Sequence, residues 1–327
     1  MRVWFRSAYV AVSLGFLVWV PHVGWAHQAQ QEVSLVVVGD VMLDDTPGKV
    51  LAQGRDPMQA FATHFKNADL RVANLECVIS TKGQAEPGKP YVFRVHPRAL
   101  KPLSQHFDAV SLANNHSGDY GPIAFSDMLS RLRKQGIQYF GGGENAKQAH
   151  KALILERKGI KIALLSYLDF LPRSFEALPH QPGVAWAEPE QVRFDIQQAR
   201  QNGADVVIPF MHWGWENERV SNATQQALAR LMIDAGADAV IGTHPHVVQD
   251  VALYNGKPIV YSLGNFVFDG FTDEANNTGW VLTLHLSKTG VERAAIVEAK
   301  INREGIPRPV KSKAPCWKKG ASEWGGC

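Results

Sequence analysis

The sequence predicts an α/β domain built around a central sheet. Short apolar runs typical of strands alternate with segments in which apolar residues recur at helical spacing. The first run, 33–38, is interrupted only by Ser34, as expected of a strand buried on both faces. With 327 residues, 45% of them hydrophobic, the chain can bury a full core as one large domain or two small ones.

Further strands are expected at 68–73, 109–112, 162–166, 205–210, 239–241 and 258–263. Helices are expected where apolar residues repeat three or four apart, at 125–132, 192–199 and 227–235, each followed by a glycine. Two late strands, 281–286 and 294–301, have no long helix between them and indicate an antiparallel edge or a second sheet. We place the domain at 33–302 and expect the basic segment 303–327, which lacks periodicity, to form a surface tail.

The first 26 residues have the three-part pattern of a secretory signal peptide. Arg2 and Arg6 precede the apolar run 8–20, and the segment ends in the small-residue sequence Gly24-Trp25-Ala26. An uncleaved N-terminal anchor is the alternative, although the run is short for a full span of about 20 residues. In either case the domain is expected outside the cytoplasm, in the periplasm or at the cell surface.

The net charge and the cysteine content indicate which partners and which disulfides to expect. The formal net charge of +3 is too small to favour a nucleic-acid partner. Three cysteines are present, and an exported protein can form disulfides. Cys316 and Cys327 could close a small loop, which leaves Cys77 as a buried apolar residue.

Six predicted strands are followed by acidic, amide or imidazole side chains, and ligands bind beyond the carboxyl ends of such strands. Singly, each side chain fits a cap, a turn or a satisfied core histidine. Together they are hard to explain by structure alone, because burying such groups unpaired costs several kcal/mol, and a divalent metal removes that cost. In chain order the polar residues are Asp40, Asn74, Glu76, Asn114, Asn115, His116, His212, His244, His246 and Asn265.

The pair His244-Pro245-His246 is the most specific element of this pattern. In an extended backbone, side chains two residues apart point the same way, so both imidazoles would enter one cavity. Glu76 has two oxygens and is a natural bridge between two ions. His116 would lie next to the metals without ligating them, where a histidine can protonate a leaving group.

Several sequence blocks carry a family pattern, in order from about residue 34 to 269. They are VGDVML (38–43), ANLE (73–76), ANNH (113–116) with DYG (119–121), HWG (212–214), GAD leading to IGTHPHVVQ (236–249), and YSLGNFVFD (261–269). With these blocks the chain resembles the CapA-type family of poly-γ-glutamate capsule biosynthesis proteins. The fold of that family is similar to calcineurin-like metallophosphoesterases, and the resemblance implies a four-layer αββα sandwich.

The resemblance also implies roles for individual residues. Two divalent ions (Mn, Zn or Fe) would be held by Asp40, Glu76, Asn115, His212, His244 and His246, with His116 as the proton donor. Candidates for substrate contact are Asn74, Arg94, Asn114 and Asn265. The chain departs from the phosphoesterases at Met42, where they usually have a histidine, and at Glu76, where they have an aspartate.

The function expected is that of an extracytoplasmic, metal-dependent phosphoesterase-like protein. It would act on a phosphoester or on an anionic polymer in the biosynthesis or export of poly-γ-glutamate or a related capsule, alongside a membrane-bound synthase complex. The alternative is a non-catalytic polymer-binding or synthase-assembly factor, which the absence of a histidine at Met42 favours. A polymer hydrolase that cuts amide bonds is a weaker third possibility.

Overall fold

The computed structural model describes residues 1–11 and 31–326, and the chain from Gln31 onward forms one compact unit. Residues 1–11 form no helix or strand, and their side chains are exposed. The expected signal peptide or anchor falls mainly on residues 12–30, outside the described part. Among the described residues, no helix combines the length and the apolar character needed to span a bilayer.

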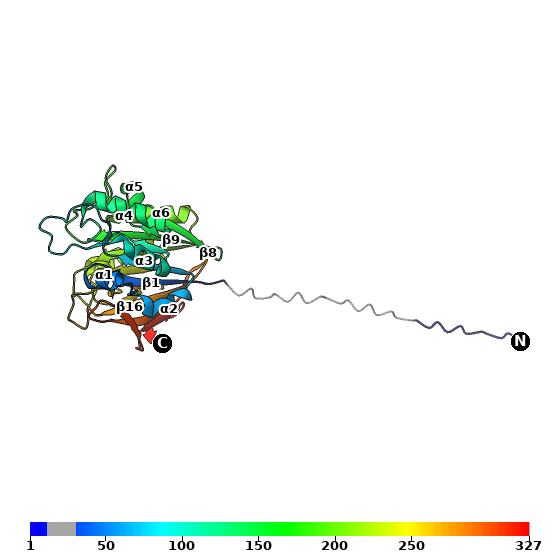
Figure 1. Ribbon diagram of the computed structural model, residues 1–327. Helices are drawn as coiled ribbons and strands as arrows, with labels where there is room; N and C mark the ends of the chain where they lie inside the picture. Colours follow the sequence, from blue (N-terminus) through cyan, green and yellow to red (C-terminus); the bar gives the residue numbers. More distant parts are fainter. Residues whose placement is uncertain (12–30, 327) are drawn as a thin grey trace. The chain divides into compact units, whose positions relative to one another are not determined.

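Two large sheets form the centre of the unit (Figure 1). The first has ten strands. β1, β2, β5, β6 and β15 form parallel pairs with one another, whereas β16 is antiparallel to β1, and β16 to β20 form antiparallel pairs. Its strands are β1 (Val33–Val41), β2 (Leu70–Leu75), β5 (Ala109–Ser111), β6 (Gln138–Phe140), β15 (Asn265–Val267), β16 (Thr278–Ser287), β17 (Gly290–Ile301), β18 (Pro307–Val310), β19 (Pro315–Lys318) and β20 (Gly325–Gly326).

The second sheet has six strands in the order β13-β14-β12-β11-β9-β8, with a parallel centre and an antiparallel strand at each edge. They are β8 (Leu153–Arg157), β9 (Ile160–Asp169), β11 (Val206–Trp213), β12 (Val240–Thr243), β13 (Val251–Tyr254) and β14 (Lys257–Val260). Two short pairs lie apart from both sheets, β3 (Val78–Ile79) with β4 (Arg94–Val95), and β7 (Gly142–Gly143) with β10 (Gly183–Val184).

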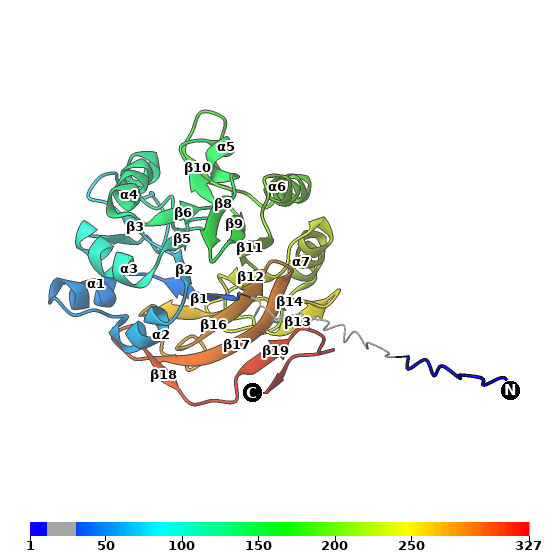
Figure 2. The same ribbon diagram turned by 90° about the vertical axis from the view of Figure 1, so that its right-hand side faces the viewer.

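Helices cover the outer faces of both sheets (Figure 2). Beside the ten-stranded sheet lie α1 (Asp45–Ala52), α2 (Ala62–Lys66), α3 (Leu100–His106) and α4 (Gly121–Gln135), with short 3-10 helices at Gln59–Phe61 and Pro97–Ala99. Beside the six-stranded sheet lie α5 (Ala146–Ala149), α6 (Pro189–Gln201) and α7 (Ala223–Ala235). Three core clusters fill the spaces between these four layers, which gives the expected αββα order.

Strand β1 shows why its valine run is nearly continuous. Val33, Leu35 and Val37 belong to the core between the two sheets, whereas Val36 and Val38 belong to the core beneath the helices. Successive side chains of a strand point to opposite faces, so a strand between two packed layers must be apolar at almost every position. Strands β9 and β11 follow the same rule, and their alternate residues fall in different core clusters.

The C-terminal segment corrects the expected domain boundary at 302 and the expected surface tail at 303–327. Strands β18 and β19 pair with β17, and Trp317 is buried in the core between the sheets. These strands have four residues each and place few side chains inward, so no apolar alternation marks them in the sequence. The expected pairing of Cys316 with Cys327 involves a residue outside the described part, and Cys77 is buried and free.

Replacing Trp317 by alanine should destabilise the fold by about 3 kcal/mol, because it empties a large buried site. Trp215→Ala is the matched control, since Trp215 is 63% exposed and its loss should change stability by no more than about 0.5 kcal/mol. Urea unfolding curves measure both values. Equal stabilities of the two variants would show that the C-terminal strands add nothing to the core.

Candidate metal centre

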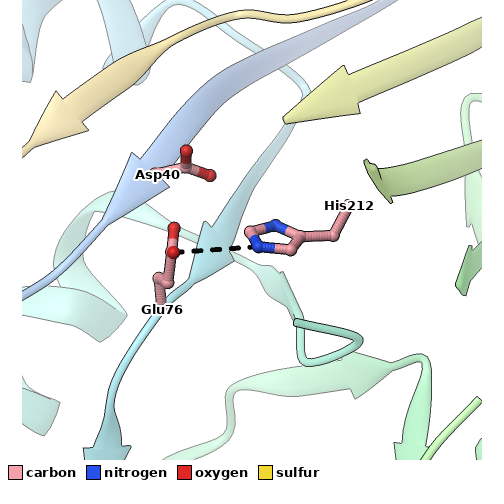
Figure 3. Close-up of side chains that lie close together, drawn as sticks. All are labelled: Asp40, Glu76 and His212. Atoms are coloured by element: carbon pink, nitrogen blue, oxygen red, sulfur yellow. Dashed lines mark ion pairs between the residues drawn. The ribbon is translucent and has the colours of Figure 1, made fainter. Parts of the chain in front are cut away.

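The carboxyl ends of the parallel strands of both sheets meet at one place. Asp40 lies near the end of β1, Glu76 follows β2, and His212 lies near the end of β11. One ligand atom from each of these three buried residues lies within 4.8 Å of the other two. Figure 3 shows the two carboxylates from the first sheet turned toward the imidazole from the second. The cluster therefore joins the two sheets.

A glycine places Asp40 in this cluster. A Cβ atom on Gly39 would lie 1.8 Å from the backbone oxygen of Gly264, so no other residue fits there. The close approach allows the backbone N–H of Asp40 to donate to that oxygen at 3.1 Å, beside the parallel pairing of β1 with β15. Close packing against Gly264 therefore requires a glycine at position 39, and this packing sets the position of the Asp40 carboxylate.

Glu76 is the focus of the centre. Its Oε1 atom is buried and has no hydrogen-bond partner among the described residues. Three Nε2 atoms surround it, those of His212 at 3.7 Å, His246 at 3.8 Å and His116 at 3.9 Å. Ligand atoms that share an ion at about 2.0–2.2 Å lie roughly 3–4 Å apart, so this spacing fits divalent metal.

The remaining ligand candidates form two groups of neighbours. In the first, Asp40 lies beside the ring of His246, 3.5 Å from Nδ1, and Nε2 of the same ring faces Glu76 at 3.8 Å. In the second, Nε2 of His212 lies 2.8 Å from Oδ1 of Asn115 and 3.1 Å from Nδ1 of His244. The buried Nε2 atom of His244 has no partner among the described residues. This arrangement fits two ions with Glu76 between them.

Neighbouring groups fix the proton on His246. The amide nitrogen of Asn265 donates to the backbone oxygens of His246 and Asn276, so its Oδ1 atom must face Nδ1 of His246, at 2.9 Å. The proton of His246 therefore lies on Nδ1, and the lone pair of Nε2 points toward Glu76. Asn265 acts here by orienting a ligand.

Asn74 and Asn114 are also occupied within the protein. The side chain of Asn74 donates to Asp40 at 2.8 Å and accepts from Asn114 at 3.0 Å. The carbonyl oxygen of Asn114 accepts from the backbone N–H of His116 at 3.1 Å. Both amides are buried and hold the carboxylates and the His116 turn. Asn114 also lines the pocket described below and Asn74 does not, so the expected substrate contact of Asn114 stays a prediction.

The backbone at His244 and His246 differs from the expected extended form. The φ angles are +97° and +57°, in the left-handed region that non-glycine residues rarely adopt. Both rings still enter the centre, with centroids 5.9 Å apart. The extended-backbone argument was therefore wrong, and a strained turn aims the two imidazoles. Strain of this kind is retained where a function depends on it.

Arg94 and Met42 have structural partners. The guanidinium of Arg94 lies 4.1 Å from the ring centroid of Tyr120 and donates to the backbone oxygens of Lys82 and Gly83. It does not line the pocket described below. The sulfur of Met42 is buried and accepts from the backbone N–H of Asp44 at 3.1 Å. Neither side chain is part of the cluster around Glu76.

Comparison with known proteins identifies the family. A family model described as "Bacterial capsule synthesis protein PGA_cap" matches residues 34–270. The chain belongs to this family. It is 32% identical to the PGA biosynthesis protein CapA of Bacillus subtilis, over 94% of this chain and 83% of that protein. It is 30% identical to the capsule biosynthesis protein CapA of Bacillus anthracis, over 88% of this chain and 71% of that protein.

A solved structure supports the fold. The crystal structure of a novel phosphatase from Mycoplasma pneumoniae superposes with a TM-score of 0.53 at 13% identity, covering 82% of this chain and 94% of that one. The expected metallophosphoesterase-like fold is confirmed. The PGA_cap chain described here thus combines the sequence of a capsule family with the fold of metal-dependent phosphoesterases, and the donor set around Glu76 is suited to divalent ions.

Three residues that sequence reasoning missed surround His116: Asp119 and Phe93, which contact its ring, and Lys89, which contacts Asp119. Nδ1 of His116 donates to Asp119 at 2.7 Å, and the same carboxylate accepts from the backbone N–H of Phe93 and from the ammonium of Lys89. The ring of Phe93 packs against the imidazole at 4.3 Å between centroids. Asp119 could have been found from the sequence, because it lies three residues after His116 in a block that carries the family resemblance. Lys89 could not, because its segment has no recognisable pattern.

A pocket of about 390 Å³ opens beside the centre. Asn115 and His116 form part of its lining, and Leu168, Phe170 and Phe175 supply apolar walls. The ring of Phe170 lies 4.0 Å from that of His244, so the pocket borders the ligand cluster directly. A substrate bound in this pocket would lie against His116 and the cluster.

Burial and mutual charge shift the protonation of the centre. Burial raises the pKa of Glu76 well above that of an ordinary carboxyl, and the nearby Asp40 raises it further. Burial, followed by the neighbouring imidazoles, holds the pKa values of His212 and His244 well below the usual value. His212 and His244 are therefore neutral at pH 7 and ready to bind metal, which requires unprotonated nitrogen.

Glu76→Gln should remove most of the metal from the protein, because it replaces the shared carboxylate by an amide. We expect affinity for Mn²⁺ or Zn²⁺ to fall by a factor of about 100 or more. Without metal the variant should be at least as stable as the wild type, because it no longer buries an unpaired carboxylate next to Asp40. Elemental analysis and urea unfolding measure the two effects, with Glu218→Gln as a surface control. Full metal content in Glu76→Gln would contradict the assignment.

The pH dependence of the unfolding free energy of the metal-free protein should reveal the protonation of His244. Because folding lowers its pKa, His244 favours the folded state above its unfolded pKa, near 6.5, and opposes folding as the pH falls below that value. Glu76 and His246 titrate in the other direction, so the difference between the wild type and His244→Asn isolates the effect. From pH 7 to pH 5 the wild type should lose about 1 to 2 kcal/mol relative to the variant after chelation. Parallel stability curves would refute this role.

Proposed function

We propose that the protein is an exported, metal-dependent hydrolase of phosphoesters that serves the synthesis or export of poly-γ-glutamate or a related anionic capsule polymer. Membership of the capsule family and the names of the two CapA relatives support the polymer. The signal-like N-terminal sequence supports a location in the periplasm or at the cell surface, with or without an anchor. A membrane-bound polymer synthase complex is the partner that this role implies.

One observation carries the catalytic part of the proposal. The unpartnered Oε1 atom of Glu76 lies among three histidine Nε2 atoms, and one of those histidines, His116, also lines the adjoining pocket. A cluster with a purely structural role would be closed to solvent, whereas this one borders a space large enough for a substrate group. The site thus has both a place for metal and a place for the molecule to be cleaved.

The side chains around His116 prepare it for proton transfer. Its Nδ1 proton is committed to Asp119, so Nε2 is the atom that exchanges a proton with a substrate oxygen. Phe93 shields one face of the ring, and Lys89 compensates the charge of Asp119. Divalent ions held by the Asp40, Glu76, Asn115 and histidine side chains would supply an activated water and stabilise charge on the substrate.

A second function, that of a non-catalytic assembly factor, is favoured by Met42. A buried thioether is a poor ligand for hard divalent ions, so the Asp40 side of the centre has one ligand fewer than in the phosphoesterases. On this view the cavity would bind polymer or a synthase subunit without cleaving a bond. The two functions predict different behaviour of His116 variants.

His116→Ala should lower kcat for glycerol 2-phosphate, whose alkoxide leaving group needs a proton, by a factor of about 100 or more, because it removes the proton-transfer group. Its metal content should equal that of the wild type, since His116 orients no ligand. The matched control is His180→Ala, which alters an exposed histidine outside the pocket and should keep full activity. Rates with Mn²⁺ and with Zn²⁺ and elemental analysis provide the measurement.

The outcome also separates the two functions. Hydrolysis by the metal-loaded wild type that is lost in His116→Ala supports the enzyme. Purified protein without activity under either metal, in which both Glu76→Gln and His116→Ala still support capsule export in cells, would establish the assembly factor instead.

A further inference from the structure

The pocket beside the metal centre carries a negative charge that no protein group neutralises. Glu86 and Glu216 both line it. Within the described residues, neither carboxylate makes a hydrogen bond or an ion pair with a side chain or with the backbone. The one cation in the lining, Lys89, directs its ammonium to Asp119 and to the backbone oxygen of Asn115. The free charges of the pocket are therefore both acidic.

These two carboxylates belong to a built site. The pocket is bordered by the cluster that holds the two buried, unpartnered polar atoms, Oε1 of Glu76 and Nε2 of His244. His116 connects them, because it lines the pocket while its Nε2 atom lies 3.9 Å from Glu76. Phe170 lines the pocket and packs on His244. The space thus has metal-binding groups at its inner end and free carboxylates in its wall.

Glu216 lines the pocket together with Asn115 and His116. It lies outside the group of ligand atoms formed by Asp40, Glu76 and His212. It lies in the turn that follows β11, four residues after His212. Its place beside the ligand cluster suits a group that contacts the substrate.

We propose that Glu216 binds an ammonium group of the substrate while the group to be cleaved lies at the metal centre, with Glu86 adding to the negative potential. This inference rests on the proposed function, since it assigns the second contact of the same substrate. Glu216 is exposed and has no cation among the described residues, so an incoming ammonium group can pair with it without displacing a protein group. A polyanion would be repelled along its length and would enter by an amine-bearing end.

The test compares two phosphonates that differ by one ammonium group and cannot be hydrolysed, 2-aminoethylphosphonate and ethylphosphonate. Calorimetric titration of the Mn²⁺-loaded full chain at pH 7 should show the amine-bearing probe binding roughly five to ten times more tightly. In Glu216→Gln the two dissociation constants should agree within a factor of about two, because the amide carries no charge. Glu218→Gln changes an acidic residue of the same loop that does not line the pocket, and it should retain the wild-type ratio.

Several results would overturn the inference: equal affinities in the wild type, a preference that survives in Glu216→Gln, or no binding of either probe. The readout is independent of turnover, so the two proposals can fail separately. Hydrolysis that depends on His116, together with equal phosphonate affinities, would leave the enzyme standing and remove the ammonium site. If the protein has no hydrolytic activity but prefers the amine-bearing probe through Glu216, the ammonium site stands and the enzyme proposal falls. The pocket would then belong to a binding protein.

Discussion

Glu76 is completely buried, and one of its oxygens has no hydrogen-bond partner among the described residues. A second carboxylate, that of Asp40, lies beside it, and together with burial it raises the pKa of Glu76. Such an arrangement opposes folding unless a cation joins it. Much of the surrounding structure is explained by this requirement, because the neighbouring strand ends supply nitrogen and oxygen atoms at distances that suit a shared ion.

The groups around the ligands serve to hold them. Asn265 fixes the proton of His246, Asn74 and Asn114 form a chain of amides behind the two carboxylates, and Asp119 holds His116. Fixed orientation matters because a metal ligand must present a lone pair, and a proton-transfer group must present a chosen nitrogen. The positive φ angles at His244 and His246 show that the backbone at these two residues also has an uncommon conformation, one that places both rings at the centre.

The charge of the pocket bears on how the centre would meet the anionic polymer that the family name implies. Its apolar walls and two free carboxylates contrast with the positive groove expected for a protein that tracks a polyanion along its length. With metal at its inner end and carboxylates in its wall, as proposed, the pocket would distinguish the two ends of a substrate. Polarity of this kind suits action at a chain end or at a small molecule better than action in the middle of an anionic chain.

The sequence by itself determined the α/β class, because strands buried on both faces must be apolar at almost every position, as β1 is. It also determined which residues gather at the strand ends, since each parallel strand delivers its next side chains to the same edge. Sequence patterns failed for the short edge strands β18 and β19, which bury too few residues to show alternation, so the continuation of the sheet past residue 302 emerged only in three dimensions.

Tertiary structure alone decided the roles within the site. Asn74, Asn114 and Asn265 differ from Asn115 only in what surrounds them, and their hydrogen bonds show that they orient other groups. Lys89 and Glu216 come from loops without periodic pattern, and only folding brings them to the pocket. Residue type limits what chemistry a position can perform, but orientation, burial and the charge of neighbours come from contacts between segments far apart in the chain.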